Sequence, residues 1–513
     1  MSNAQSGLPH GWEWAEVGDL LSVRGGYAFK SSAFCDHGIP LIRQGDLGTE
    51  EVDVSGAKRL PEYYLDEHIR YAIRQGDLLV GMSGALGKVS EYKESQPALQ
   101  NQRTGLLKLA SPIGTGFARL LMQAVETQIR RKGKGMAVQN VSARDIESCE
   151  TPVPPAPEQR RIVSKIEELF SELDAGTQAL DRAEAKLERY RASVLKAAVG
   201  GKLTEQWRSE NPVQETGQEL LDRILVERRA RWEEEQLGRY EAKGKEPPKN
   251  WQAKYKEPVG PDTSDLPELP EGWCWTNLDQ LTSMVTSGSR GWAKYYADKG
   301  RAIFFRIGNV VRDQLRPDMS DIQWVTPPVG AEGLRTAVQE GDLMISITAD
   351  LGRVAVVPAG IEEGYINQHL ALCRPIGGVF GSFVATVLAS EPGQQSLLRR
   401  DRGVVKAGLG LDDIREVLIP LPPMQEQKEI VLKCERHFEM IDAVRRSLHM
   451  CGLRSNTTRQ SILKRAFEGR LVPQDPDDGP ASVLLERIRA QREAEPKKKR
   501  RTKKKTPQPE PDL

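Results

Sequence analysis

Residues 83–90, "SGALGKVS", form a glycine-rich stretch that ends in a lysine, the composition of a loop that cradles phosphate groups. Such a loop needs a glycine five residues before Gly87 and a serine or threonine directly after the lysine. Met82 and Val89 occupy those two places. The stretch therefore does not predict nucleotide binding.

Other catalytic arrangements are also missing from the sequence. A nuclease could be assembled from Glu62, Glu91 and Lys93, but such acidic and basic pairs are common in a chain that is 28% charged. We find no glycine-rich S-adenosylmethionine loop and no Asn/Asp-Pro-Pro-aromatic tetrapeptide. The six cysteines show no zinc-like spacing. The sequence therefore predicts no enzyme activity, no catalytic residue and no metal site in this chain.

Positive charge is concentrated in three segments. They are "RRKGKGMAVQN" (130–140), "LLRRDRGVVKAG" (397–408) and "PKKKRRTKKK" (496–505). The formal net charge of the chain is +1, so any affinity for a polyanion must come from such local patches. The last segment predicts an unfolded tail that binds phosphates without sequence preference and weakens with salt.

Two of these segments precede related stretches of the chain. Comparing 145–203 with 413–471 at a constant offset of 268 gives 22 identities in 59 positions without a gap. Unrelated sequences would share roughly three or four. "PPAPEQRRIV" (154–163) and "PPMQEQKEIV" (422–431) show the similarity most clearly. The chain contains an internal duplication.

Each copy predicts one long helix. A glutamate stands at the expected first turn and glycines stand at the end, after a seam of apolar or small residues that alternates steps of four and three. In the first copy this seam consists of Ile162, Ile166, Leu169, Leu173, Gly176, Leu180, Ala183, Leu187, Tyr190, Val194 and Ala197. Such a helix would be about 60 Å long. We expect the two helices to pair antiparallel, with a domain attached at each end.

The segments before the two helices are also related. "LPHGWEWAEVGDL" (8–20) matches "LPEGWCWTNLDQL" (269–281), and "IRQGDLLVGMSGALGKV" (73–89) matches "VQEGDLMISITADLGRV" (338–354). Short strand-like runs after Gly-Asp turns, and a helix over 116–131, predict an α/β domain in each copy. We expect the paired tryptophans of each opening, Trp12 with Trp14 and Trp273 with Trp275, to cap the domain cores.

The order of these motifs resembles the specificity subunit of type I restriction–modification systems over nearly the whole chain. The resemblance rests on the openings "LPHGW" and "LPEGW", the "GDLL" turn, the "NQ" pairs and the Pro-Pro-x-x-Glu-Gln junctions, each in the same order in both copies. It implies a mixed α/β fold with two target-recognition domains, joined by two long antiparallel coiled-coil helices in a pseudo-two-fold internal repeat. The implied segments are 1–150 (target-recognition domain 1), 151–203 (central spacer helix), 204–268 (helical and proline-rich linker), 269–418 (target-recognition domain 2), 419–471 (distal spacer helix) and 472–513 (short helix and basic tail).

The resemblance implies a protein that reads a split target on double-stranded DNA, one half-site per domain. It also implies two methyltransferase (modification) subunits as partners, which recruit restriction subunits. S-adenosylmethionine, ATP and Mg²⁺ would then serve those partner chains, with no cofactor in this one. A half-site separation of about 34 Å would place both domains on one face of the duplex.

Base edges and phosphates are read by Arg, Lys, Asn, Gln and hydroxyl side chains. In the first domain such candidates are Arg43, Gln44, Ser83, Lys88, Asn101, Gln102, Arg103, Arg130, Arg131, Lys132, Lys134, Gln139 and Asn140. In the second domain they are Arg306, Asn309, Thr348, Arg353, Asn367, Gln368, His369, Arg399, Arg400, Arg402 and Lys406. Any one of them could instead be a solvated charge or could hold a turn together.

Two other functions remain compatible with the sequence. The chain could serve a complex that methylates DNA without restricting it, or it could be a protein-interaction scaffold that does not bind DNA sequence-specifically. The sequence contains no run of 18 apolar residues and no signal pattern at its start, so we expect a cytoplasmic protein without a membrane segment.

Overall fold

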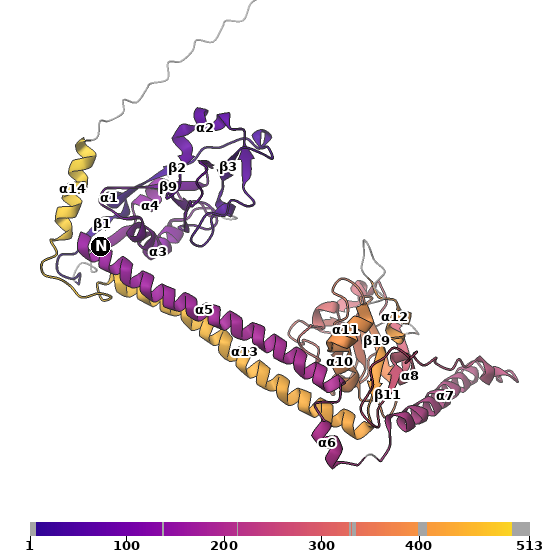
Figure 1. Cartoon of the computed structure of the whole chain (residues 1–513). Coiled ribbons are helices and arrows are strands. Elements are labelled where there is room, and N and C mark those ends of the chain that lie inside the picture. Colours follow the sequence, from indigo (N-terminus) through magenta and orange to yellow (C-terminus); the bar gives the residue numbers. More distant parts are fainter. Residues whose placement is uncertain are drawn as a thin grey trace, which may run out of the picture. The chain divides into compact units, whose positions relative to one another are not determined.

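The computed structural model describes residues 7–135, 138–212, 214–327, 330, 335–398 and 408–494. It divides into two compact units. Unit 1 combines Met1–Leu180 with Met450–Leu513, and unit 2 is Asp181–His449. Each unit holds one α/β domain together with one part of each of the two long helices, α5 (Ala156–Val199) and α13 (Met424–Phe467) (Figure 1).

The domain of unit 1 contains two four-stranded sheets and a two-stranded ribbon in its described part. The first sheet has the order β2 (Leu21–Gly25), β9 (Thr104–Leu109), β6 (Leu78–Gly81), β7 (Val89–Glu91), and all its pairs are antiparallel. The second has the order β4 (Lys58–Leu60), β3 (Ile39–Ile42), β8 (Ala98–Gln100), β5 (Ala72–Ile73), and only β3 and β8 run parallel among these. The ribbon pairs β1 (Glu13–Glu16) with β10 (Glu150–Val153). The helices are α1 (Val17–Leu20), α2 (Tyr63–Glu67), α3 (Thr115–Lys132), α4 (Ala143–Glu147) and α14 (Ala481–Ala494).

The domain of unit 2 repeats the first sheet and the ribbon of unit 1, but the fourth strand of its second sheet lies at the opposite edge. Its first sheet has the order β12 (Thr282–Ser287), β19 (Leu370–Pro375), β16 (Leu343–Ser346), β17 (Val354–Val356). Its second has the order β13 (Tyr296–Ala297), β15 (Gln323–Val325), β14 (Ala302–Phe305), β18 (Gly364–Ile366), with β14 and β18 parallel. The ribbon pairs β11 (Cys274–Asn277) with β20 (Leu418–Leu421). Its described helices include α6 (Glu205–Glu210), α7 (Gly217–Glu241), α8 (Leu278–Leu281), α10 (Gly381–Ala389), α11 (Glu391–Leu398) and α12 (Leu411–Arg415).

The core of each domain lies between its all-antiparallel sheet and the helix that follows it. In unit 1 the inward side chains of β2, β6 and β9 pack against α3, where Phe117, Leu121 and Val125 are buried. In unit 2, Phe383, Val384 and Val387 of α10 occupy the corresponding place. The sheets that the two domains have in common and the mixed α/β class agree with the fold that the sequence predicts.

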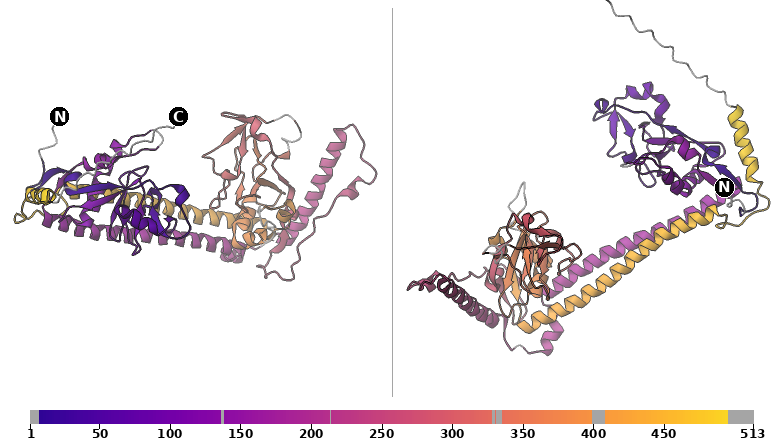
Figure 2. Two further views of the ribbon diagram at one scale, coloured as in Figure 1. Left: turned by 90° about the horizontal axis from the view of Figure 1, so that it is seen from above. Right: turned by 180° about the vertical axis from the view of Figure 1, so that it is seen from behind.

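The two long helices are each 44 residues long and are antiparallel within each unit. In unit 1 the guanidinium of Arg459 lies 4.9 Å from the ring centre of Phe170 and pairs with Asp174. In unit 2 the guanidinium of Arg191 lies 4.2 Å from the ring centre of Phe438. Both the arginines and the phenylalanines are equivalent residues of the repeat, so the same cation–π contact forms twice. The predicted antiparallel pairing is confirmed, and Figure 2 shows the two helices side by side in each unit.

A buried tryptophan–glutamate hydrogen bond joins each domain to the start of a long helix. Trp12 Nε1 donates to Glu158 Oε2 at 2.9 Å, and Trp273 Nε1 donates to Glu426 Oε2 at 2.8 Å. Both glutamates are 1% exposed. The indole of the "LPxGW" opening therefore satisfies the glutamate of the junction, which explains why both motifs occur twice.

Each domain also contacts the end of the other long helix. Gly469, just after α13, has a φ of +66°, and a Cβ there would lie 2.2 Å from Pro9 Cγ. Gly201, just after α5, has a φ of +70°, and its Cβ would lie 2.4 Å from Pro270 Cγ. Both positions require glycine, because of the left-handed backbone and because of the close approach. The two prolines come from the same openings, so each opening is fixed to both helices of its unit.

The short helix that follows each long helix docks on the domain of its own unit. In α7, Leu220, Leu221 and Ile224 are buried, and in α14 the equivalent residues Leu484, Leu485 and Ile488 are buried. Arg492 donates to Gly18 O at 2.6 Å, and its counterpart Arg228 donates to Thr282 O at 3.1 Å.

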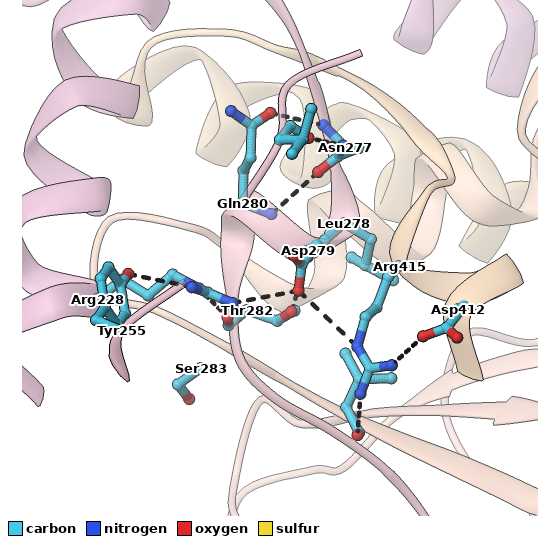
Figure 3. Close-up of polar contacts among 12 residues, drawn as sticks. Arg228, Tyr255, Asn277, Leu278, Asp279, Gln280, Thr282, Ser283, Asp412 and Arg415 are labelled. Carbon is cyan, nitrogen blue, oxygen red and sulfur yellow. Dashed lines mark hydrogen bonds and ion pairs between the residues drawn. The ribbon is translucent and has the colours of Figure 1, made fainter. Parts of the chain in front are cut away.

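In unit 2 this contact extends into a small ionic network (Figure 3). Arg228 pairs with Asp279 at 3.2 Å and donates to the Tyr255 hydroxyl at 3.1 Å, and Arg415 of α12 lies 3.9 Å from the same aspartate. The Asn277 and Gln280 side chains form the capping box of α8 beside it. The network holds α7, α8 and α12 together.

The expectation that all four tryptophans of the openings cap the domain cores is wrong in part. Trp12 and Trp273 are buried, but Trp14 is 41% exposed and Trp275 is half-buried, donating to Pro267 O at 3.0 Å. The first tryptophan of each pair meets the glutamate, and the alternation of the ribbon strand turns the second one outward.

Candidate nucleic-acid interface

Four loops of unit 1 meet at one edge of its two sheets, and we call their described residues rim 1 (43–44, 82–88, 101–103, 133–135 and 138–141). Backbone hydrogen bonds connect three of them, because Met82 N donates to Arg103 O at 3.1 Å and Gly84 N donates to Gln139 O at 2.9 Å. The fourth loop touches the second, since a Cβ at Gly84 would lie 2.7 Å from Gln44 Nε2. The structure therefore brings together residues that are almost 100 positions apart in sequence.

The candidate residues of rim 1 differ in how much of the side chain is accessible. Gln102, Arg103, Lys134, Gln139 and Asn140 are exposed, and Arg43, Gln44, Lys88 and Asn101 are half-buried. Ser83 is 2% exposed, so its hydroxyl does not face the surface of the rim. Within the described residues, the side chains of Gln102 and Arg103 make no hydrogen bond, which leaves an amide and a guanidinium available to a ligand.

The basic residues at the end of α3 have partly structural roles. Arg130 pairs with Glu126 at 2.7 Å on the same helix, and Lys132 Nζ donates to Ser148 O at 2.8 Å, just after α4. Arg131 is exposed. Two of the three charges at this point are therefore engaged within the unit.

Unit 2 builds the equivalent edge, rim 2 (residues 306–309, 347–353 and 367–369). Ser83, Gln102 and Arg103 of rim 1 correspond to Thr348, Gln368 and His369 of rim 2. Ala349 stands in place of Gly84 and has a φ of +61°, close to the +69° of the glycine. The backbone of the loop is thus preserved although the side chains differ. Arg399, Arg400, Arg402 and Lys406 lie outside the described residues.

The residues after β3 and β14 close a short turn. Arg43 N donates to Asp46 Oδ2 at 2.7 Å, and Arg306 N donates to Asn309 Oδ1 at 2.8 Å. Asn309 is 5% exposed, and its amide donates to the backbone carbonyls of Asp318 and Asp321 at 2.9 and 3.0 Å. Its hydrogen-bonding groups are therefore occupied inside the unit.

The candidate residues Thr348, Gln368 and His369 are in mutual contact. His369 Nδ1 lies 2.6 Å from Thr348 Oγ1, and His369 Nε2 lies 2.8 Å from Gln368 Nε2. Asn367 is 8% exposed, and its Oδ1 accepts from His369 N at 3.2 Å. Hydrogen bonds to Thr348 and within the turn therefore fix residues 367–369.

Arg353, the counterpart of Lys88, is bound locally. Its Nε donates to Asp350 Oδ2 at 2.8 Å, and its Nη1 donates to Val310 O at 3.2 Å. The hydrogen bond from Arg353 lowers the pKa of Asp350, and Arg312 adds to this effect. The aspartate thus remains charged beside the rim.

The sequence did not single out Tyr27. Its backbone bridges to Asn101 of rim 1, its ring is 41% exposed, and the ring centres of Phe29 and His68 lie 4.9 and 4.7 Å away. The aromatic and basic spacing of "GYAFK" (26–30) is the signal that could have indicated it. An exposed aromatic cluster next to a rim is suited to contact with bases or sugars.

Among the residues that the structure describes, no cluster of three or more His, Cys, Asp or Glu side chains could hold a metal ion. In the same part of the chain, no helix has the length and apolarity needed to span a lipid bilayer.

Residues 9–183 match the family model described as "Type I restriction modification DNA specificity domain". The chain is also similar, over nearly all its length, to two curated proteins. It is 24% identical to the type I restriction enzyme EcoBI specificity subunit of Escherichia coli, covering 94% of this chain and 93% of that protein. It is 24% identical to the EcoKI specificity subunit of Escherichia coli (strain K12), covering 95% and 97%.

The chain is thus similar to type I restriction–modification specificity subunits over nearly its whole length. A solved chain described as "Structural basis underlying complex assembly and conformational transition of the type I R-M system" has the same fold. It superimposes with a TM-score of 0.60 at 17% identity, covering 90% of this chain and 99% of that one. The fold of that solved chain therefore extends over both units, although the family model matches only residues 9–183, the first domain and part of the first long helix.

Proposed function

We propose that this chain is the DNA sequence-recognition subunit of a type I restriction–modification complex and is not itself an enzyme. It reads a bipartite target on double-stranded DNA with one half-site per domain, 1–150 for one and 269–418 for the other. The proposal rests on one observation: the two domains share backbone structure but differ in the side chains of their rims. Unit 1 and unit 2 repeat the same first sheet, the same ribbon and the same left-handed loop position, yet rim 1 presents Gln102 and Arg103 where rim 2 presents Gln368 and His369.

Domain exchange tests independent reading. Replacing residues 1–150 with the corresponding domain of another family member should change one half of the methylated sequence, as read by methylome sequencing. The matched exchange of 269–418 should change the other half. A change in both halves from one exchange would contradict the proposal.

We further propose that rim residues contact phosphates as well as bases. Binding of the assembled complex to duplex DNA should then weaken with salt, with a slope of about −0.9 in log–log form for each phosphate neutralised. Competition between target and random duplex at several salt concentrations distinguishes recognition from scaffolding. A protein scaffold would show neither the slope nor the preference.

Exposed apolar residues on the long helices support docking of partner subunits. On α13 they are Leu432, Met440 and Val444 in unit 2 and Met450 and Leu453 in unit 1, from 40% to 58% exposed. Apolar helix faces of this kind accept helices of a partner. We propose that they hold two modification subunits, which in turn recruit restriction subunits. S-adenosylmethionine, ATP and Mg²⁺ would be used by those chains.

The long helices would then measure the unread spacer between the half-sites. Inserting seven residues between positions 174 and 184 of α5 and seven more between 445 and 459 of α13 keeps the apolar seam and adds about 10 Å. The recognised spacer should lengthen by about three base pairs. Insertion into one helix alone is the control and should disrupt pairing. An unchanged spacer in the double insertion would overturn this role.

A further inference from the structure

Thr348, His369 and Gln368 form a continuous hydrogen-bonded chain in rim 2. The distances are 2.6 Å from Thr348 Oγ1 to His369 Nδ1 and 2.8 Å from His369 Nε2 to Gln368 Nε2. All three side chains are half-buried, so the chain runs from the loop after β16 to the surface of the turn between β18 and β19.

The direction of the hydrogen bonds follows from the groups involved. An amide nitrogen can only donate, so His369 Nε2 accepts from Gln368. A neutral imidazole that accepts at Nε2 carries its proton at Nδ1, which donates to Thr348 Oγ1. In the described residues, Gln368 Oε1 and the second amide N–H have no hydrogen-bond partner. The imidazole therefore selects one orientation of the glutamine amide.

The backbone around this chain is also fixed. Ile347 N donates to His369 O at 3.0 Å, and Asn367 N donates to Phe305 O at 3.0 Å. Asn367 Oδ1 accepts from His369 N, which closes the turn. Little conformational freedom remains to be lost when the amide meets a ligand, and such preorganisation favours binding.

Rim 1 lacks this chain although it has the same backbone. The residue in place of Thr348 is Ser83, which is 2% exposed, and the residue in place of His369 is Arg103. In the described part of unit 1, the side chains of Gln102 and Arg103 make no hydrogen bond. The arrangement is therefore particular to the second domain and is not a requirement of the fold.

We propose that Gln368 reads an adenine in the major groove, and that His369 and Thr348 are positioning residues that orient its amide. This rests on the proposed function. Gln368 Oε1 would accept from the adenine N6 amino group, and the free amide N–H would donate to adenine N7, the bidentate pattern that glutamine makes with adenine. Guanine offers O6, an acceptor, where adenine offers a donor, so the fixed amide rejects it.

The test uses the complete specificity subunit assembled with its partner subunits, on the target found by methylome sequencing. Each adenine of the target is replaced in turn by 7-deazaadenine, which lacks the N7 acceptor. For the unchanged protein, one position should lower affinity by roughly 5- to 150-fold, the cost of leaving the glutamine N–H without its acceptor. With Gln368→Ala, affinity for the unmodified target should fall and the effect of 7-deazaadenine at that position should disappear.

Thr348→Val and Thr348→Ser separate positioning from packing, because valine has the size of threonine without its hydroxyl and serine keeps the hydroxyl. The valine variant should lose most of the sensitivity to 7-deazaadenine, and the serine variant should keep it. Gln102→Ala in rim 1 is the matched control and should leave sensitivity at that position unchanged.

Two results would overturn the inference. In one, Gln368→Ala remains sensitive at the same position. In the other, the valine and serine variants, both shown to melt like the unchanged protein, respond equally. Failure of the unchanged complex to prefer its target over random duplex would instead overturn the proposed function, and that preference is measured first.

Discussion

The two junctions between domain and helix share one hydrogen bond and differ in what surrounds it. Glu426 receives Arg208 Nη2 at 2.8 Å in addition to Trp273, whereas Glu158 receives neutral donors, Trp12 and Gln474 at 2.9 and 2.7 Å. Burial raises the pKa of Glu158. The geometry of the joint is thus the same in both units, while its electrostatics is not.

The two rims likewise share their backbone positions and differ in their side chains. Equivalent loops follow equivalent strands, and the left-handed position in each rim is kept whether it is Gly84 or Ala349. The residues that face outward differ in charge and in hydrogen bonding. The repeat therefore preserves backbone positions while side-chain chemistry diverges, as the proposed reading of two unlike half-sites requires.

Removing the charge at the two junctions should give the largest difference between the units. Glu426→Gln leaves Arg208, 16% exposed, without its carboxylate and should lower the free energy of unfolding of unit 2 by about 3 kcal/mol. Glu158→Gln replaces a carboxyl that has neutral partners and should cost at most about 1 kcal/mol. Urea midpoints followed by tryptophan fluorescence compare the two. If both substitutions lower the free energy of unfolding equally, the ion pair with Arg208 does not stabilise its junction.

Substitutions at the two left-handed loop positions, Gly84 and Ala349, should change the stability of the protein in opposite directions. Gly84→Ala forces a side chain into that backbone and toward Gln44, and should cost about 1 kcal/mol. Ala349→Gly relieves the same strain at some entropic cost and should be stabilising by about 0.5 kcal/mol. Thermal denaturation of both variants measures this. A destabilising Ala349→Gly would mean that the alanine methyl packs favourably enough to offset the strain.

The two Arg–Phe contacts of the long helices should also prove unequal. Arg459 pairs with Asp174, so Arg459→Met should cost about 0.5–1 kcal/mol. Arg191 is 6% exposed, burial lowers its pKa, and its Nη2 has no hydrogen-bond partner among the described residues. Arg191→Met should therefore leave stability unchanged or slightly higher. Hydrogen exchange on either side of the substitution, in α5 for Arg191→Met and in α13 for Arg459→Met, can compare them, and a larger loss at Arg191 would contradict this.

The smallest effect is a pH dependence at Glu158. Its pKa is raised above the ordinary value of 4.5, so the folded chain holds a proton that the unfolded chain releases. Folding is therefore favoured more at acid pH, and this contribution is lost as the pH rises from about 4.5 through the raised pKa. The stability of the unchanged protein relative to Glu158→Gln should decline over that window. If the difference in stability between the two proteins does not change with pH, burial does not disfavour ionisation of the Glu158 carboxyl.

Local pattern was enough to predict the long helices, the duplication and the strands after the Gly-Asp turns. Periodic apolar residues, helix-ending glycines and a gap-free repeat act through nearest neighbours along the chain, so they can be read without coordinates. The same holds for the residue types of the rims. Their accessibility was not readable, because the burial of Ser83 and the internal bonding of Asn309 depend on how separate loops meet.

Two like domains, two equal helices and a glutamate at the start of each helix follow from the residue pattern along the chain. Three sets of contacts became visible in the folded chain alone. Trp12 and Trp273 donate to those glutamates, Pro9 meets Gly469 and Pro270 meets Gly201, and His369 lies between Thr348 and Gln368. Each of these contacts joins residues distant in sequence, and its energy depends on a distance of a few ångströms that no local pattern specifies.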